Sequence, residues 1–133
     1  MKTPLLLVSI LAIGSISPAF ADSFWSHNGS LMRLQAQGNN RIITYEMPSD
    51  KMRSAGVTKG TLLFDGVRSG DKYSGTARVF SKYCHSSMKY KVKGNVYGET
   101  VILFGSRPSY GEGCKANGRM TTDKLVFEYV SSE

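Results

Sequence analysis

The sequence is poor in the residues that carry hydrolytic or metal chemistry. It has two histidines, two cysteines and ten acidic residues that are scattered along 133 positions. There is no D-x-D, H-x-x-E or E-x-x-H spacing, no serine within G-x-S-x-G and no glycine-rich phosphate-binding loop. These absences argue against a metalloenzyme, a serine hydrolase or a P-loop protein. We therefore expect no metal, no cofactor and no enzymatic activity.

Long apolar runs are also scarce, and the main one lies at the N-terminus. Lys2 is followed by an apolar run from Leu5 to Ile16 and then by Ala19-Phe20-Ala21. A positive start, a short apolar core and an A-x-A site form a secretory signal peptide. The run of 12 residues is shorter than the roughly 20 that span a bilayer. The pattern predicts a signal peptide over residues 1–21, cleaved between Ala21 and Asp22, and a periplasmic or secreted protein. The alternative is an N-terminal membrane anchor.

The remaining chain is short and basic. Cleavage would leave 112 residues (133 − 21), and the loss of Lys2 would lower the formal net charge from +7 to +6. This length suits a single domain over residues 22–133 with one modest core, and neither a linker nor an internal repeat divides it.

Both cysteines, Cys84 and Cys114, lie in this part of the chain. Because an exported chain meets an oxidising compartment, the pair predicts one disulfide. The alternative is a pair of free thiols that act as metal ligands or as a nucleophile. Cys84 stands beside His85, but adjacent residues on a strand point to opposite faces and could not share a proton there.

Apolar and polar residues alternate repeatedly, whereas no helical period of any length occurs. We expect a helical turn over Lys51–Ala55, capped by Ser49 or Asp50, and a loop from Ser106 to Asp123 pinned by Cys114. Gly94-Asn95 is typical of a turn, and Phe24-Trp25 stand before the first strand. Seven strands are expected, over residues 31–37, 41–47, 61–65, 72–80, 88–93, 100–104 and 124–130.

This pattern predicts an all-β fold, a small antiparallel β-barrel or sandwich of about seven to eight strands with one disulfide. A closed barrel is favoured because closure removes exposed strand edges. Gly75 in mid-strand indicates a bend or a bulge. The aromatic residues in the strands, among them Phe64, Tyr73 and Phe104, are interpreted as core.

The basic residues are the main indication of function. Lys89, Lys91 and Lys93 fall on one face of a single strand, and Arg78 is near in sequence. Such a stripe either keeps the protein soluble and blocks an edge, or forms an anion-binding site. The candidate ligands are an acidic envelope glycan and a lipid head group. Export argues against nucleic acid.

A second set of candidate contact residues lies in or beside expected turns. Trp25, His27, Lys72 and Tyr73 are the candidates, and His27 is expected to be a solvated turn residue. The two long loops, over residues 48–60 and 106–123, are further candidate surfaces, for instance for a protein partner.

Three stretches together resemble a group of small exported proteins from rhizobia and related proteobacteria. They are Trp25–Leu34, Gly56–Gly66 with the following Tyr73–Ala77, and Leu103–Pro108. This resemblance implies a bacterial periplasmic or secreted protein and supplies no activity and no site residues.

Ser69–Tyr73 is more weakly similar to a loop of the MliC-type periplasmic lysozyme inhibitors, which are small disulfide-bonded barrels. That likeness implies an inhibitor that acts through a loop. However, the positive charge of the chain would repel a cationic lysozyme. The expected function is therefore a non-enzymatic binding or structural module of the cell envelope. The alternatives are an inhibitor of a hydrolase such as lysozyme and a small hydrolase with dispersed catalytic residues.

Overall fold

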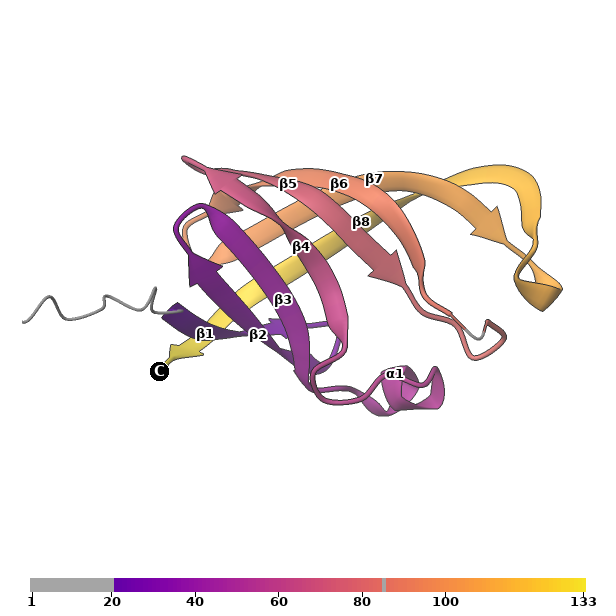
Figure 1. Ribbon diagram of the computed structural model, residues 1–133, viewed down its shortest axis with the longest axis horizontal. Coiled ribbons are helices and arrows are strands. Elements are labelled where there is room, and N and C mark those ends of the chain that lie inside the picture. The colour runs from indigo at the N-terminus through magenta and orange to yellow at the C-terminus, as the bar shows by residue number, and fades with distance from the viewer. Residues whose placement is uncertain (1–20, 85) are drawn as a thin grey trace, which may run out of the picture.

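The computed structural model describes residues 21–84 and 86–133, which form a closed antiparallel β-barrel (Figure 1). Each strand pairs with the next along the chain, and the last strand pairs with the first. The predicted all-β class and the single disulfide are confirmed. The eight strands are β1 (Ala21–His27), β2 (Ser30–Gln37), β3 (Asn40–Met47), β4 (Leu62–Ser69), β5 (Lys72–Val79), β6 (Met88–Tyr97), β7 (Thr100–Tyr110) and β8 (Ala116–Ser132).

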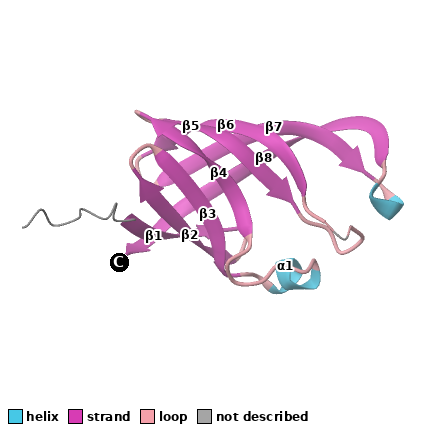
Figure 2. Cartoon of the chain, viewed as in Figure 1, coloured by secondary structure: helices cyan, strands magenta, loops and turns pink. Residues whose placement is uncertain are grey.

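Within the described residues, the helical structure consists of two short segments, α1 (Asp50–Ser54) and the 3₁₀ turn η1 (Glu112–Cys114) (Figure 2). The Ser49 hydroxyl accepts a hydrogen bond from the Met52 amide at 3.3 Å and caps α1. The capped helical turn predicted after Pro48 is therefore confirmed.

Most of the predicted signal peptide lies outside the described residues. The last residue of the predicted signal peptide, Ala21, is the first residue of β1 and lies opposite Ala36 of β2. His85 also lies outside the described residues. Within residues 21–84 and 86–133, no helix combines the length and the apolar character needed to cross a membrane.

Strand β1 was not among the expected strands, and the placement of Phe24-Trp25 before the first strand is wrong. Both residues lie inside β1, opposite Arg33 and Met32 of β2. The connection is an Asn28-Gly29 turn in which both residues have positive φ, 47° and 80°. Asn-Gly favours this turn because both residues tolerate the left-handed conformation, and its twist suits a two-residue hairpin.

Two expected interruptions are also wrong. Instead of forming a loop over 106–123, β7 continues to Tyr110 and β8 begins at Ala116, so the two strands form a long hairpin that extends beyond the barrel (Figure 1). Gly94-Asn95 is not a turn, since β6 runs on to Tyr97. A Cβ at Gly94 would overlap the Ile102 carbonyl on β7, so glycine here permits a close approach of two strands. Gly75 allows the same close approach to Asp65 on β4.

The interior of the barrel is packed with side chains. Five of these side chains are at most 1% exposed, namely Met32, Ile43, Phe64, Leu103 and Phe127. They come from the inward positions of five strands, as the two-residue period of a strand requires. Because the interior is filled, ligand-binding surfaces have to be sought on the outside and at the ends of the barrel.

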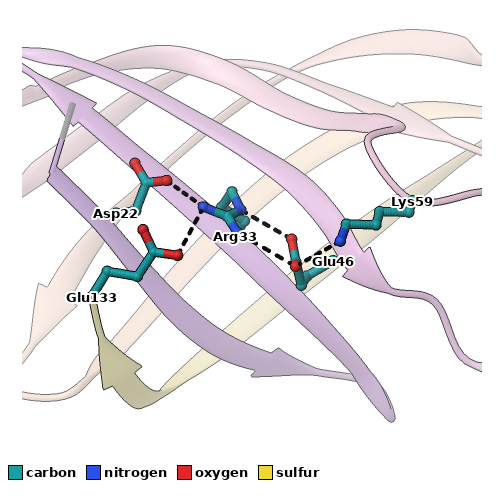
Figure 3. A network of polar contacts seen from close by, with 5 residues as sticks. All are labelled: Asp22, Arg33, Glu46, Lys59 and Glu133. Atoms are coloured by element: carbon teal, nitrogen blue, oxygen red, sulfur yellow. Dashed lines mark hydrogen bonds and ion pairs between the residues drawn. The ribbon is translucent and has the colours of Figure 1, made fainter.

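The two ends of the described chain are joined on the outer surface by an ionic cluster centred on Arg33 (Figure 3). The Arg33 guanidinium donates to Glu46 of β3 at 2.9 Å, to Asp22 of β1 and to the terminal Glu133. Lys59 approaches Glu46 from the other side at 3.2 Å. The hydrogen bond from Arg33 is the main reason that the pKa of Glu46 is lowered. The cluster thus links β1, β2, β3 and the C-terminus at the point where the barrel closes.

Candidate anion-binding groove

The three lysines of the predicted stripe project outward from β6. Lys89, Lys91 and Lys93 are exposed, and the residues between them, Tyr90 and Val92, are buried. The predicted alternation along this strand is therefore confirmed. Across the ladder, Lys91 faces Thr76 of β5 and Lys93 faces Ser74.

A groove runs over the outer face of the sheet beside these lysines. One part, of about 570 Å³, lies over β5 to β8, and a second part, of about 540 Å³, continues toward β4. The two parts share Ser74, Lys93 and Phe104, and we call them together the β5–β8 groove. The first part is also lined by Gly75, Lys91, Val92, Gly105, Ser106 and Thr122, and the second by Val67, Ser69, Lys72, Tyr73, Gly94 and Asn95.

The groove lies where the ladder between two neighbouring strands ends. The ladder between β6 and β7 ends at Lys93 and Phe104, whereas β7 stays paired with β8 beyond this point. Gly105 lies just beyond this end, and β6 still passes close to it, since a Cβ there would overlap the Lys91 carbonyl. The lysines of β6 therefore form one side of the groove, and Ser106 and Thr122 form the other, with their hydroxyls 3.4 Å apart.

The lysines around the groove are not neutralised by carboxylates. In the described part of the chain, no carboxylate oxygen lies within 4.0 Å of the ammonium groups of Lys72, Lys91, Lys93 or Lys124. Lys91 donates to the Thr76 hydroxyl at 3.3 Å. The groove therefore carries uncompensated positive charge, which favours anionic ligands.

Arg78, the fourth residue of the predicted anion site, does not belong to this free positive charge, because it is paired with a carboxylate. Its guanidinium donates to Asp65 at 2.6 Å, and its side chain is only 10% exposed. The neighbouring strand β4 supplies the carboxylate, because Asp65 lies opposite Thr76 and thus beside Arg78. Arg78 therefore holds β4 against β5.

Two of the candidate loop contacts are buried instead. His27 is 7% exposed, and its ring stacks on Phe127 with centroids 4.5 Å apart. Its Nδ1 lies 2.8 Å from the Val126 carbonyl, which can only accept, so Nδ1 carries the proton. Burial lowers the pKa of His27. Tyr73 is 2% exposed and packs beside Phe64. The expectation of a solvated His27 is therefore wrong, and Tyr73 offers the groove only a small part of its surface.

The other two candidates are placed apart. Trp25 is half-buried in β1, with its Nε1–H donated to Ser23 at 2.8 Å and its ring edge-on to Tyr129. Lys72 is exposed at the start of β5 and lines the groove. Only Lys72 of these four thus joins the lysines of β6.

Phe104 is the residue of the groove that the sequence pattern misassigns. It is 46% exposed and points outward, opposite Lys93 on one side and Lys124 on the other. The segment Val101-Ile102-Leu103-Phe104 is apolar throughout, so its sequence does not reveal which residues face inward. Only the alternation from buried Val101 and Leu103 identifies the outward face.

The described residues contain no metal-ligand cluster and no free thiol. No three His, Cys, Asp or Glu side chains among them lie close enough to hold a metal ion. Cys84 is bonded to Cys114 and is not a free thiol. Burial raises the pKa of Tyr45 to about 12 and also raises that of Tyr90. Both phenols are therefore protonated at neutral pH.

The groove is thus a hollow, lysine-lined surface with one exposed aromatic ring. No family model, no curated protein and no solved structure matches this chain.

Proposed function

We propose that this protein is an exported, non-enzymatic module that binds anionic groups of the cell envelope through the β5–β8 groove. The observation that carries the proposal is the set of lysines that line one hollow without a carboxylate partner among the described residues. Because side chains fill the interior of the barrel, a ligand has to bind on an outer surface such as this groove.

Export is part of the same proposal. The N-terminal pattern of residues 1–21 is that of a signal peptide, and the mature chain would begin at Asp22. The disulfide between Cys84 and Cys114 supports a location outside the cytoplasm, since such bonds persist in oxidising compartments. A periplasmic or secreted protein with a basic groove meets acidic glycans and anionic lipid head groups, which are the candidate ligands.

The test is a charge reversal in the groove with a matched control. Lys91→Glu/Lys93→Glu changes two exposed lysines of the groove. The control, Lys51→Glu/Lys115→Glu, makes the same change in net charge at two exposed residues outside it. Binding of both variants to lipopolysaccharide and to phosphatidylglycerol vesicles is measured between about 50 and about 300 mM NaCl, over which screening of exposed charges increases strongly.

We expect the wild-type protein to bind at least one of these probes and to lose affinity steeply as salt rises. The groove variant should bind about tenfold or more weakly, because a like charge replaces an attractive one. The control should bind almost as well as the wild type. Equal losses in both variants, or binding that does not change with salt, would contradict the proposal.

A further inference from the structure

The groove has an apolar component that a simple cationic patch does not need. Phe104 leaves 46% of its surface exposed, and it lies directly opposite Lys93 on β6 and Lys124 on β8. The Lys124 ammonium is 6.0 Å from the centre of the ring. A row of lysine, phenylalanine and lysine therefore crosses three strands at the groove. A ligand that covers the ring gains hydrophobic contact in addition to charge pairing.

Neutral hydroxyls complete the lining. Ser74 lies opposite Lys93, and Ser106 and Thr122 face each other across β7 and β8. All three are exposed and can both donate and accept hydrogen bonds. The nearby arginines, Arg78 and Arg107, are instead bonded to Asp65 and Asp123 at 2.6 Å each. The groove thus offers single lysine charges among hydroxyls rather than the bidentate arginine pairs that suit densely charged phosphates.

The shape of the groove also separates ligand classes. The apolar ring lies in the lining of a hollow rather than on a projecting surface, which favours a chain lying in the groove over a flat lipid layer.

We infer that the β5–β8 groove binds a carboxylated sugar chain. The apolar face of one sugar ring lies on Phe104, its carboxylate lies between Lys93 and Lys124, and its hydroxyls bond to Ser74, Ser106 and Thr122. This inference rests on the proposed function and narrows it from anionic groups in general to acidic glycans. Phe104 distinguishes binding of an acidic glycan from binding of anionic groups in general, because its ring contributes apolar contact and no charge.

The experiment uses Phe104→Ala, with Phe104→Trp as the conservative variant. Met120→Ala is the matched control, because Met120 is 67% exposed and lies on β8 outside the groove lining. The probes are oligogalacturonate, its uncharged methyl ester, polyphosphate and phosphatidylglycerol vesicles. Affinities are measured by calorimetry, and amide shifts by NMR locate the bound probe.

We expect oligogalacturonate to bind and to shift amides of β6, β7 and β8 around the groove. Phe104→Ala and the methyl ester should each lower the affinity about tenfold, which corresponds to the loss of about 1.4 kcal/mol. Phe104→Trp and Met120→Ala should bind like the wild type. Polyphosphate binding should be unchanged in Phe104→Ala, because only charge holds it.

Two results would overturn the inference in different ways. Binding of polyphosphate or vesicles that depends on the lysines, with no binding of oligogalacturonate, would remove the glycan and leave the proposed function standing. Binding of every probe that is indifferent to Lys91→Glu/Lys93→Glu would remove both.

Discussion

His27 shows how burial of one side chain makes stability depend on pH. Its ring is enclosed beside Phe127 and keeps one hydrogen bond, to the Val126 carbonyl. Burial disfavours the charged imidazolium, so the folded-state pKa lies below the ordinary value of 6.5. Below pH 6.5, His27 binds a proton in the unfolded chain more readily than in the folded chain, which lowers the free energy of unfolding.

The resulting prediction concerns acid stability. The free energy of unfolding should be constant above about pH 7 and should fall as the pH drops through about 6.5 toward the folded-state pKa. Urea unfolding at a series of pH values measures this. His27→Phe removes the titrating ring, and its stability should decline less over the same range. An identical decline in both proteins would show that other groups cause it.

Gly94 is the glycine whose substitution tests the close approach of β6 and β7. Gly94→Ala should lower the free energy of unfolding by about 2–3 kcal/mol, because the new Cβ overlaps the Ile102 carbonyl and the backbone has to shift. Gly111→Ala is the control. There a Cβ would be 4.0 Å from its nearest neighbour, and the change should stay within about 0.5 kcal/mol. Urea unfolding compares the two variants, and a tolerated Gly94→Ala would refute this account of the strand spacing.

Among the elements, the long β7–β8 hairpin is held to the barrel by the disulfide. Cys84 lies in the connection between β5 and β6, and Cys114 lies at the end of η1 near the tip of the hairpin. The bond therefore joins two segments at the same end of the molecule (Figure 1).

Removal of this bond should destabilise the protein by about 3–4 kcal/mol, as the chain-entropy model predicts for a loop of this length. The variant Cys84→Ser/Cys114→Ser is compared with the oxidised wild type by urea unfolding. Hydrogen exchange should accelerate most in residues 106–122, which depend on the hairpin alone. Exchange that stays slow in these residues would show that the hairpin is stable without its link.

At this scale the sequence predicts regular alternation well and irregular strands poorly. Lys89 to Lys93 alternates fully, and its strand and faces are correctly predicted. Strand β1 and the outer half of the β7–β8 hairpin escape prediction because their serines, glycines and Pro108 have the composition of loops. Their pairing partners hold them in strands, and the partners are fixed only by the closed barrel. The prediction that Phe104 belongs to the core fails for the same reason, since the strand register decides which way its side chain points.

At the level of the whole barrel, the Arg33 cluster adds ion pairs to the β1–β8 ladder at the closure. Arg33→Ala would leave Asp22, Glu46 and Glu133 close together without their shared cation (Figure 3). We expect a loss of about 1–3 kcal/mol in the free energy of unfolding, because partly buried carboxylates lose their hydrogen bonds. Added salt should recover part of this loss by screening the repulsion.

Arg53→Ala is the matched control for this prediction. Arg53 meets the fully exposed Asp50 at 3.9 Å, and such surface pairs contribute less than about 1 kcal/mol. Urea unfolding of both variants at low and high salt measures the difference. Equal effects would mean that the cluster does not stabilise the closure.

The pairing of the first strand with the last also sets the order of events during folding. Every other ladder joins strands that are consecutive in the chain, whereas Ser26 and Glu128 are 102 positions apart (128 − 26). Closing so long a loop lowers the chain entropy before any contact between β1 and β8 has formed, so we expect this pairing to be the slow step. Until β8 pairs with β1, the chain is therefore an open sheet with two unsatisfied edges. This one pairing decides when the sheet is protected from pairing with other molecules.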